Sequence, residues 1–288
     1  MKNDKNLFYL LLFLAMIGWG ASWINAKVLS RYIDAYDMIF FRFAATALTM
    51  VPIIIVLKKS FKIDFKTLLI VFASSIVLIA YMRYYFLGTT YGTASLGGAL
   101  VTTLVPINTF IFLVLLGKKK MTKKDAFALA VGAIGVMSML NVWKFDIKEI
   151  MVVQNLYFIL ASLLWPILTI ISAKSTKISP IVFTFYLYIV TVMIDGLFFV
   201  NFESIKFSSF DHLFWINIAS LVLLATTYAN TIYFLGIEKL GAGGVSSFIF
   251  FVPFSAIILS AIFLNEHISA SIVIGTILTI IAVKLLNR

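Results

Sequence analysis

The feature that most constrains this sequence is a series of long apolar segments that follow one another along the whole chain. The ten segments cover residues 7–29, 38–57, 67–90, 94–116, 124–143, 152–174, 181–200, 213–236, 243–264 and 270–287. A helix needs roughly 20 mostly apolar residues to cross the hydrocarbon core of a bilayer. The pattern therefore predicts an all-α integral membrane protein with ten transmembrane helices.

The composition supports the same class and excludes several others. Of the 288 residues, 62% are hydrophobic and 12% are charged, whereas soluble domains are about 45–50% apolar and about 25% charged. The chain has no cysteine, which excludes disulfides and thiolate catalysis. Its two histidines, His212 and His267, lie in predicted loops, so we expect neither a metal site nor a cofactor.

Positive charge is distributed unevenly between the two sides of the predicted membrane. With the N-terminus inside, the inner segments hold sixteen of the 23 lysines and arginines, and the outer segments hold five. Loops rich in lysine and arginine stay on the cytoplasmic side. We therefore expect both termini in the cytoplasm, and this distribution explains the net charge of +11 without a nucleic-acid partner.

The chain also shows signs of an internal duplication. Pro106 aligns with Pro253 at an offset of 147 residues, and the apolar runs and their interruptions then fall in step. The two halves, residues 1–145 and 150–288, would each hold five helices. An odd number of helices per repeat predicts that the second half is inverted in the membrane. In transporters built this way, the substrate site lies near the midplane between the repeats.

Two prolines near the centres of the fourth and ninth segments are candidate helix hinges. Proline removes a backbone hydrogen bond and bends a helix, and in lipid the freed carbonyl must find a partner or face a wet cavity. The equal depths of Pro106 and Pro253 favour hinges beside a cavity, although kinks tolerated by packing are the structural alternative.

Aromatic and amide side chains at similar depth are the predicted walls of that cavity. A tryptophan in mid-membrane needs a partner for its indole N–H, and aromatic faces suit a flat or cationic solute. Packing between helices is the alternative role for these side chains. The candidate substrate-binding residues are Trp19, Trp23, Tyr81, Tyr84, Asn108, Trp165 and Tyr228.

Three charged residues inside the predicted spans need an explanation of their own. Arg42, Arg83 and Asp195 all fall in the outer half of the membrane, where an unpaired charge is costly. We expect an Asp–Arg pair that is structural, gates the pathway or binds substrate. An arginine neighbour would keep Asp195 ionised, so the sequence argues against a proton relay through buried carboxylates.

Several motifs in this order resemble the EamA-type transporters of the drug/metabolite transporter superfamily. They are Gly18-Trp19-Gly20-Ala21-Ser22, Phe41-Arg42, the two prolines, and Leu264-Asn265-Glu266. The resemblance covers essentially the whole chain. The family usually carries an acidic residue at the ends of the fourth and ninth helices; Glu266 fits this pattern, whereas Lys119 occupies the first position.

The resemblance implies a secondary transporter in the plasma (inner) membrane of a bacterium or archaeon. Export of a small metabolite, such as an amino acid or an organic cation, by alternating access is favoured. The alternatives are a metabolite importer and a flippase for a lipid or lipid precursor. The spans lack paired carboxylates or a histidine cluster for catalysis, and the chain lacks a nucleotide-binding loop, so we expect neither an enzyme nor an ATPase subunit.

Overall fold

The computed structural model describes residues 2–141, 143, 152–175, 178–233, 235–236 and 247–286, which contain helices but no strand. The helices are α1 (Lys2–Leu29), α2 (Ala35–Val56), α3 (Phe65–Tyr91), α4 (Ala94–Leu115), α5 (Lys123–Met139), α7 (Val153–Ser172), α8 (Pro180–Phe198), α9 (His212–Ala219), α11 (Phe251–Leu264) and α12 (Ala270–Leu286). The all-helical prediction is confirmed for these residues.

Most of these helices have the length that a bilayer requires. Seven described helical segments are long and apolar enough to cross a membrane, and one of them is α9 with its continuation to Tyr233. Two shorter apolar helices, α11 and α12, accompany them. Because a helix rises 1.5 Å per residue, about 20 residues span the roughly 30 Å hydrocarbon core. The helix lengths therefore agree with a multi-pass membrane protein.

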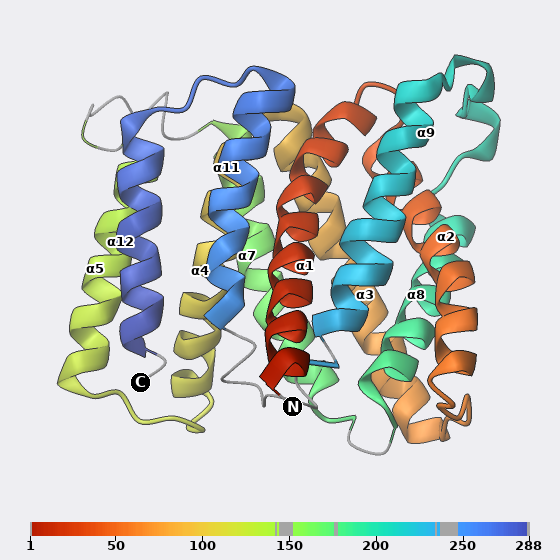
Figure 1. Cartoon of the computed structure of the whole chain (residues 1–288), viewed down its shortest axis with the longest axis horizontal. Coiled ribbons are helices and arrows are strands. Elements are labelled where there is room, and N and C mark those ends of the chain that lie inside the picture. The colour runs from red at the N-terminus through yellow and green to blue at the C-terminus, as the bar shows by residue number, and fades with distance from the viewer. Residues whose placement is uncertain are drawn as a thin grey trace.

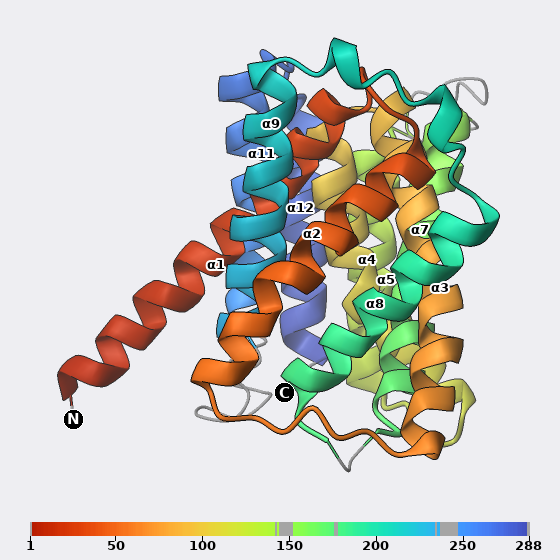
Figure 2. The same cartoon turned by 90° about the vertical axis from the view of Figure 1, so that its right-hand side faces the viewer.

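The helices form one upright bundle in which the start of α1 and the end of α12 lie at the same end (Figure 1). We call this the terminal end, and the other the opposite end. α5 and α12 pack against each other at one edge of the bundle, and α2 packs against α8 and α9's continuation at the other. α1, α3, α4, α7 and α11 fill the middle, and Figure 2 shows the first turns of α1 extending away from the other helices.

Close contacts between α1, α4 and α11 hold the middle of the bundle together. A Cβ atom at Gly98 of α4 would overlap the Cβ of Ala256 in α11, and one at Gly20 of α1 would lie 2.5 Å from the Cβ of Ser255. Small residues allow membrane helices to approach in this way. The glycines thus bring helices from both halves of the sequence into direct contact.

α9 continues beyond Ala219 as nine residues, Ser220–Tyr228, with the wide turns of a π-helix. The hydroxyl of Thr226 donates to the carbonyl oxygen of Leu221, five residues earlier, at 2.8 Å. Wide turns of this type are rare and occur frequently at functional sites. We call this stretch the wide-turn segment.

The two prolines differ in their positions. Pro106 lies inside α4, as expected, but Pro253 is the third residue of α11, which follows a 3₁₀ turn at Ser247–Phe250. The first N–H groups of a helix have no acceptor within it, so proline is tolerated there. Pro253 thus lies near the start of α11 and not at its centre, and the hinge at Pro253 stays a prediction. The predicted start of that span, at residue 243, lies outside the described residues.

Candidate functional site

Arg42 of α2 is a buried cation, with 7% of its surface exposed. Its Nε donates to the Thr226 hydroxyl of the wide-turn segment at 3.0 Å, and its Nη1 lies 3.6 Å from the sulfur of Met82 in α3. The guanidinium carbon is 5.5 Å from the centroid of the Phe43 ring. All three partners are neutral, so none of them balances the positive charge of Arg42.

Tyrosines of α3 and α8 interact with this guanidinium, and a tryptophan of α7 lies against one of them. Tyr81 and Tyr85 of α3 and Tyr188 of α8 each interact electrostatically with Arg42. Trp165 of α7 lies against Tyr81, with 4.8 Å between the ring centroids. We call Tyr81, Tyr85, Trp165 and Tyr188 the aromatic cradle. It combines a flat apolar surface with hydroxyl groups beside one positive charge.

Trp23 packs against Tyr85, one of the residues of the aromatic cradle. Its ring centroid lies 4.3 Å from that of Tyr85 and 6.1 Å from that of Phe158, and only 2% of its surface is exposed. It also fills the space beside Gly98, where an added Cβ would lie 3.2 Å from the indole. The structure therefore places Trp23 in the packed core, where it supports Tyr85.

Trp19 connects to the same site through hydrogen bonds. Its indole N–H donates to the side-chain oxygen of Asn230 at 3.0 Å, and the Asn230 amide donates to the Tyr188 hydroxyl at 2.6 Å. Tyr188 in turn stacks on Phe43, with 4.6 Å between centroids. These hydrogen bonds join α1, α8 and the helical turn after the wide-turn segment. They also give the indole N–H of Trp19 its partner.

Three predicted cavity residues lie elsewhere. Tyr84 stacks on Tyr157 of α7, with 5.9 Å between centroids. The Asn108 amide donates to the carbonyl and the hydroxyl of Ser162 at 3.1 and 3.0 Å, which ties α4 to α7. The Tyr228 hydroxyl donates to a backbone carbonyl of α1 at 3.0 Å. The structure shows these residues as contacts between helices, outside the Arg42 cluster.

The predicted Asp–Arg pair is not formed among the described residues. Asp195 is fully buried, and neither of its oxygens has a hydrogen-bond partner there. Arg83 is exposed and donates to the hydroxyl of Tyr36, with its guanidinium 4.8 Å from the Tyr36 ring centroid. Arg42 bonds to Thr226. The interpretation that an arginine holds Asp195 ionised is corrected accordingly.

The groups that act electrostatically on Asp195 are themselves acidic. They are Asp34 and Asp37, at the start of α2. Asp34 already serves as the N-cap of that helix, where it accepts from the N–H groups of Tyr36 and Asp37 at 2.8 and 2.9 Å. The start of α2 therefore places two further acidic side chains near Asp195. Neither of them can form an ion pair with it.

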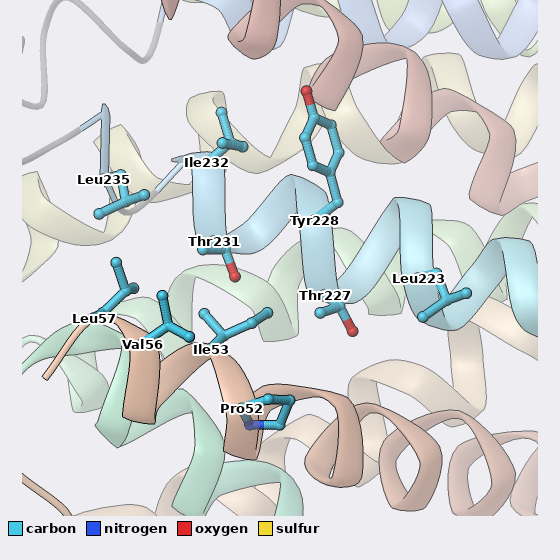
Figure 3. Close-up of a pocket in the computed structure, with 10 residues that line it drawn as sticks. All are labelled: Pro52, Ile53, Val56, Leu57, Leu223, Thr227, Tyr228, Thr231, Ile232 and Leu235. Atoms are coloured by element: carbon cyan, nitrogen blue, oxygen red, sulfur yellow. The ribbon is translucent and has the colours of Figure 1, made fainter. Parts of the chain in front are cut away.

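An apolar groove of about 380 Å³ lies between the last turns of α2 and the helix that follows α9 (Figure 3). Thr227 and Thr231 direct their hydroxyls toward α2, whereas the Tyr228 ring points the other way. The Thr227 hydroxyl lies 2.6 Å from that of Thr49. Thr227 adjoins Thr226, so the groove begins one residue from the partner of Arg42.

At the opposite end, Lys27 and Glu266 form hydrogen bonds with the backbone of the connection between α3 and α4. The Lys27 amine donates to two carbonyl oxygens at the end of α3, at 2.7 and 2.9 Å. The Glu266 carboxylate accepts from the N–H groups of Ala94 and Ser95, at the start of α4, at 2.7 and 2.9 Å. Both residues line a second pocket of about 380 Å³. We call this arrangement the α3–α4 clamp.

Sequence reasoning missed part of this site. Thr226 and Tyr188 stand in apolar runs where hydroxyl side chains are common, so only the wide turns single out Thr226. Tyr85 belongs to the polar stretch of α3, but spacing does not reveal that it faces Arg42. In the described part of the chain, no group of three or more His, Asp or Glu side chains is arranged to hold a metal ion.

Comparisons with known proteins agree with this architecture. The EamA-like transporter family model matches the chain twice, at residues 6–141 and 153–288. The uncharacterized transporter YetK of Bacillus subtilis (strain 168) is 25% identical over 272 residues, which cover 90% of this chain and 80% of YetK. A solved crystal structure matches with a TM-score of 0.65 at 14% identity, covering 97% of this chain and 96% of that one, and so shares the fold.

Proposed function

The chain belongs to the EamA-like transporter family, and from this premise we propose that it is a secondary transporter that exports a small metabolite by alternating access. The observation that carries the proposal is the Arg42 site. Arg42 and Tyr85 come from the first half of the chain, and Tyr188 and Thr226 come from the second. A polar site between two repeats is where a transporter of this kind binds its substrate.

We propose ten spans, with α9 and its continuation as one span and α5, α11 and α12 as three others. The repeats are residues 1–145 and 150–288, inverted relative to each other. Two matches to one family model support the duplication. The uneven lysine distribution supports cytoplasmic termini, and the bacterial relative supports a plasma-membrane location.

Cysteine labelling tests this topology, because the chain has no native cysteine. Ser60 and Ser208 are both exposed and lie in loops on opposite sides of the proposed membrane. In intact cells, Ser208→Cys should react with an impermeant maleimide and Ser60→Cys should be protected. The reverse pattern would exclude cytoplasmic termini.

Alternating access is supported by the contrast between the two ends of the bundle. The α3–α4 clamp ties α1, α3, α4 and the residues after α11 together at the opposite end. Toward the terminal end, the groove beside Thr227 separates α2 from its neighbour. We assign this arrangement to an inward-facing or occluded state.

The lining of the groove makes a flippase the less favoured alternative. A lipid headgroup would need charged or strongly polar groups along a lateral opening. The described lining contains two threonines and one tyrosine among apolar side chains, and no charged residue. A small metabolite that binds at Arg42 fits this structure better.

A thermal-shift screen of the purified protein against small metabolites, followed by counterflow in proteoliposomes, tests transport itself. Trp19→Phe removes the N–H that orients Asn230 and should reduce exchange of the stabilising compound. Tyr84→Phe is the matched control, since its ring stacks on Tyr157 away from the site. Equal exchange by both variants would argue against the Arg42 site as the transport site.

A further inference from the structure

The geometry points to a solute class: we propose that Arg42 binds the single carboxylate of the transported solute, and that the aromatic cradle packs against its apolar part. This inference rests on the proposed transport function. Of the two solute classes favoured by the sequence, it selects amino acids, with other carboxylic acids, over organic cations.

The first argument is the charge of Arg42. A guanidinium keeps its proton in proteins, and burial of an unpaired charge is unfavourable. Arg42 is 7% exposed, and its partners are a hydroxyl, a thioether and aromatic rings. The buried carboxyl group of Asp195 bonds to no described residue. Among the described residues, no hydrogen-bond partner of Arg42 is therefore an anion, and we assign the balancing negative charge to the solute.

The second argument is the way the protein holds this guanidinium. The Thr226 hydroxyl donates to Leu221 and can only accept from Arg42, so it orients Nε without neutralising it. The wide turns that place Thr226 there are uncommon in helices and frequent at functional sites. The guanidinium is thus held in place while its charge stays available for a planar, two-oxygen ligand.

The third argument concerns the size and charge of the ligand. Arg42 is one guanidinium that forms a hydrogen bond with Tyr85 and acts electrostatically on Tyr81 and Tyr188, and one such charge matches one negative charge. A dianion such as a phosphate monoester would leave a net negative charge in the site. The rings of Tyr81 and Trp165, tilted by 58° with 4.8 Å between their centroids, offer an apolar surface to the rest of the solute.

The test compares carboxylic acids with their primary amides, using the full-length protein in detergent. Each pair, drawn from amino acids and aromatic monocarboxylates, keeps the body of the compound and removes the charge. We expect acids from this set to raise the melting temperature and their amides to have no effect. Equal shifts from acids and amides, or shifts only from amines or phosphate monoesters, would overturn the proposal.

Substitutions then assign the effect to Arg42. Arg42→Gln should weaken binding of the stabilising acid about ten- to hundred-fold, as expected for loss of a charge-assisted hydrogen bond. Arg83→Gln is the matched control, because Arg83 is exposed and bonds to Tyr36. Unchanged binding by Arg42→Gln would refute the assignment. The comparison of acids with amides uses the native protein and so stands if the variant does not fold.

Counterflow separates this inference from the proposed function. If acids and amides exchange equally well across proteoliposomes, the protein is a transporter and the carboxylate assignment is wrong. If no compound that shifts the melting temperature exchanges, the transport proposal itself fails.

Discussion

Arg42 and Asp195 are both buried charged residues, but their surroundings differ. Arg42 has a hydroxyl partner, a sulfur neighbour and aromatic rings around it. Asp195 has no hydrogen-bond partner among the described residues, and Asp34 and Asp37 act on it as like charges. Side chains from several helices surround Arg42, whereas Asp195 is buried without a hydrogen-bond partner in the part of the chain that the structure describes.

The two side chains differ in how a membrane protein can tolerate them. A carboxyl group can lose its charge by binding a proton, whereas a guanidinium cannot lose a proton at physiological pH. Arg42 therefore needs a negatively charged ligand, while Asp195 needs only a proton. We infer that Arg42 is retained for binding, and that Asp195 lowers the stability of the fold.

The largest expected effect comes from Arg42→Met, which removes the charge and keeps much of the volume. Binding of the stabilising acid should fall about ten- to hundred-fold. The free energy of unfolding should stay the same or rise by about 1–4 kcal/mol, as when other buried charges are replaced by apolar groups. Ligand titration and thermal melting measure the two quantities. A large loss of stability would mean that Arg42 is mainly structural.

Asp195→Leu should have the next largest effect, in the stabilising direction. Removal of an unsatisfied buried polar group should raise the free energy of unfolding by about 1–3 kcal/mol. Asp195→Asn keeps a polar group at the site and should raise the free energy of unfolding by less than Asp195→Leu does. Thermal melting of the two variants gives the comparison. A lower melting temperature for Asp195→Leu would show that Asp195 has a stabilising partner.

Unlike Asp195, the Glu266 carboxylate accepts hydrogen bonds from the N–H groups of Ala94 and Ser95. Glu266→Gln leaves one oxygen to accept from the start of α4 and should cost about 1 kcal/mol, typical of a lost helix cap. A cysteine at Leu96, in the clamp pocket, should then react faster from outside the membrane. Lys119→Gln is the control, because Lys119 bonds to the carbonyl of Leu286. Unchanged labelling and melting would rule out a role for Glu266 in closing that end.

The smallest effect is expected at Asp211, an exposed carboxylate outside the spans. The N–H of Phe214 and the hydroxyl of Tyr32 donate to it at 3.0 and 2.8 Å, and these hydrogen bonds lower the pKa of Asp211. Because its pKa is lower in the folded state, its stabilising contribution is complete above the pKa of the unfolded chain. That contribution is lost as the pH falls through the lowered pKa. The melting temperatures of Asp211→Asn and the native protein should therefore become equal only at acidic pH. A difference in melting temperature that stays constant with pH would contradict this prediction.

The sequence indicates which aromatic side chains need partners within the predicted spans, and the structure shows what some of those partners are. Trp19 stands at mid-depth and needs a partner, and the structure supplies Asn230. Tyr81 and Trp165 are predicted at similar depths and do meet. Depth does not fix direction, however, and Tyr84 on the same helix as Tyr81 turns to Tyr157.

The amino-acid sequence alone predicts the class of protein, because runs of about 20 apolar residues leave a chain few alternatives to helices in lipid. It also determined the family, through motifs whose order spans both halves. Which side chains surround each charged residue depends on how the helices pack. Arg42 and Asp195 have similar predicted depths, but helix rotation and the wide-turn segment direct Arg42 toward Thr226 and leave Asp195 near the start of α2. Such directions depend on packing between helices, which no single apolar run encodes.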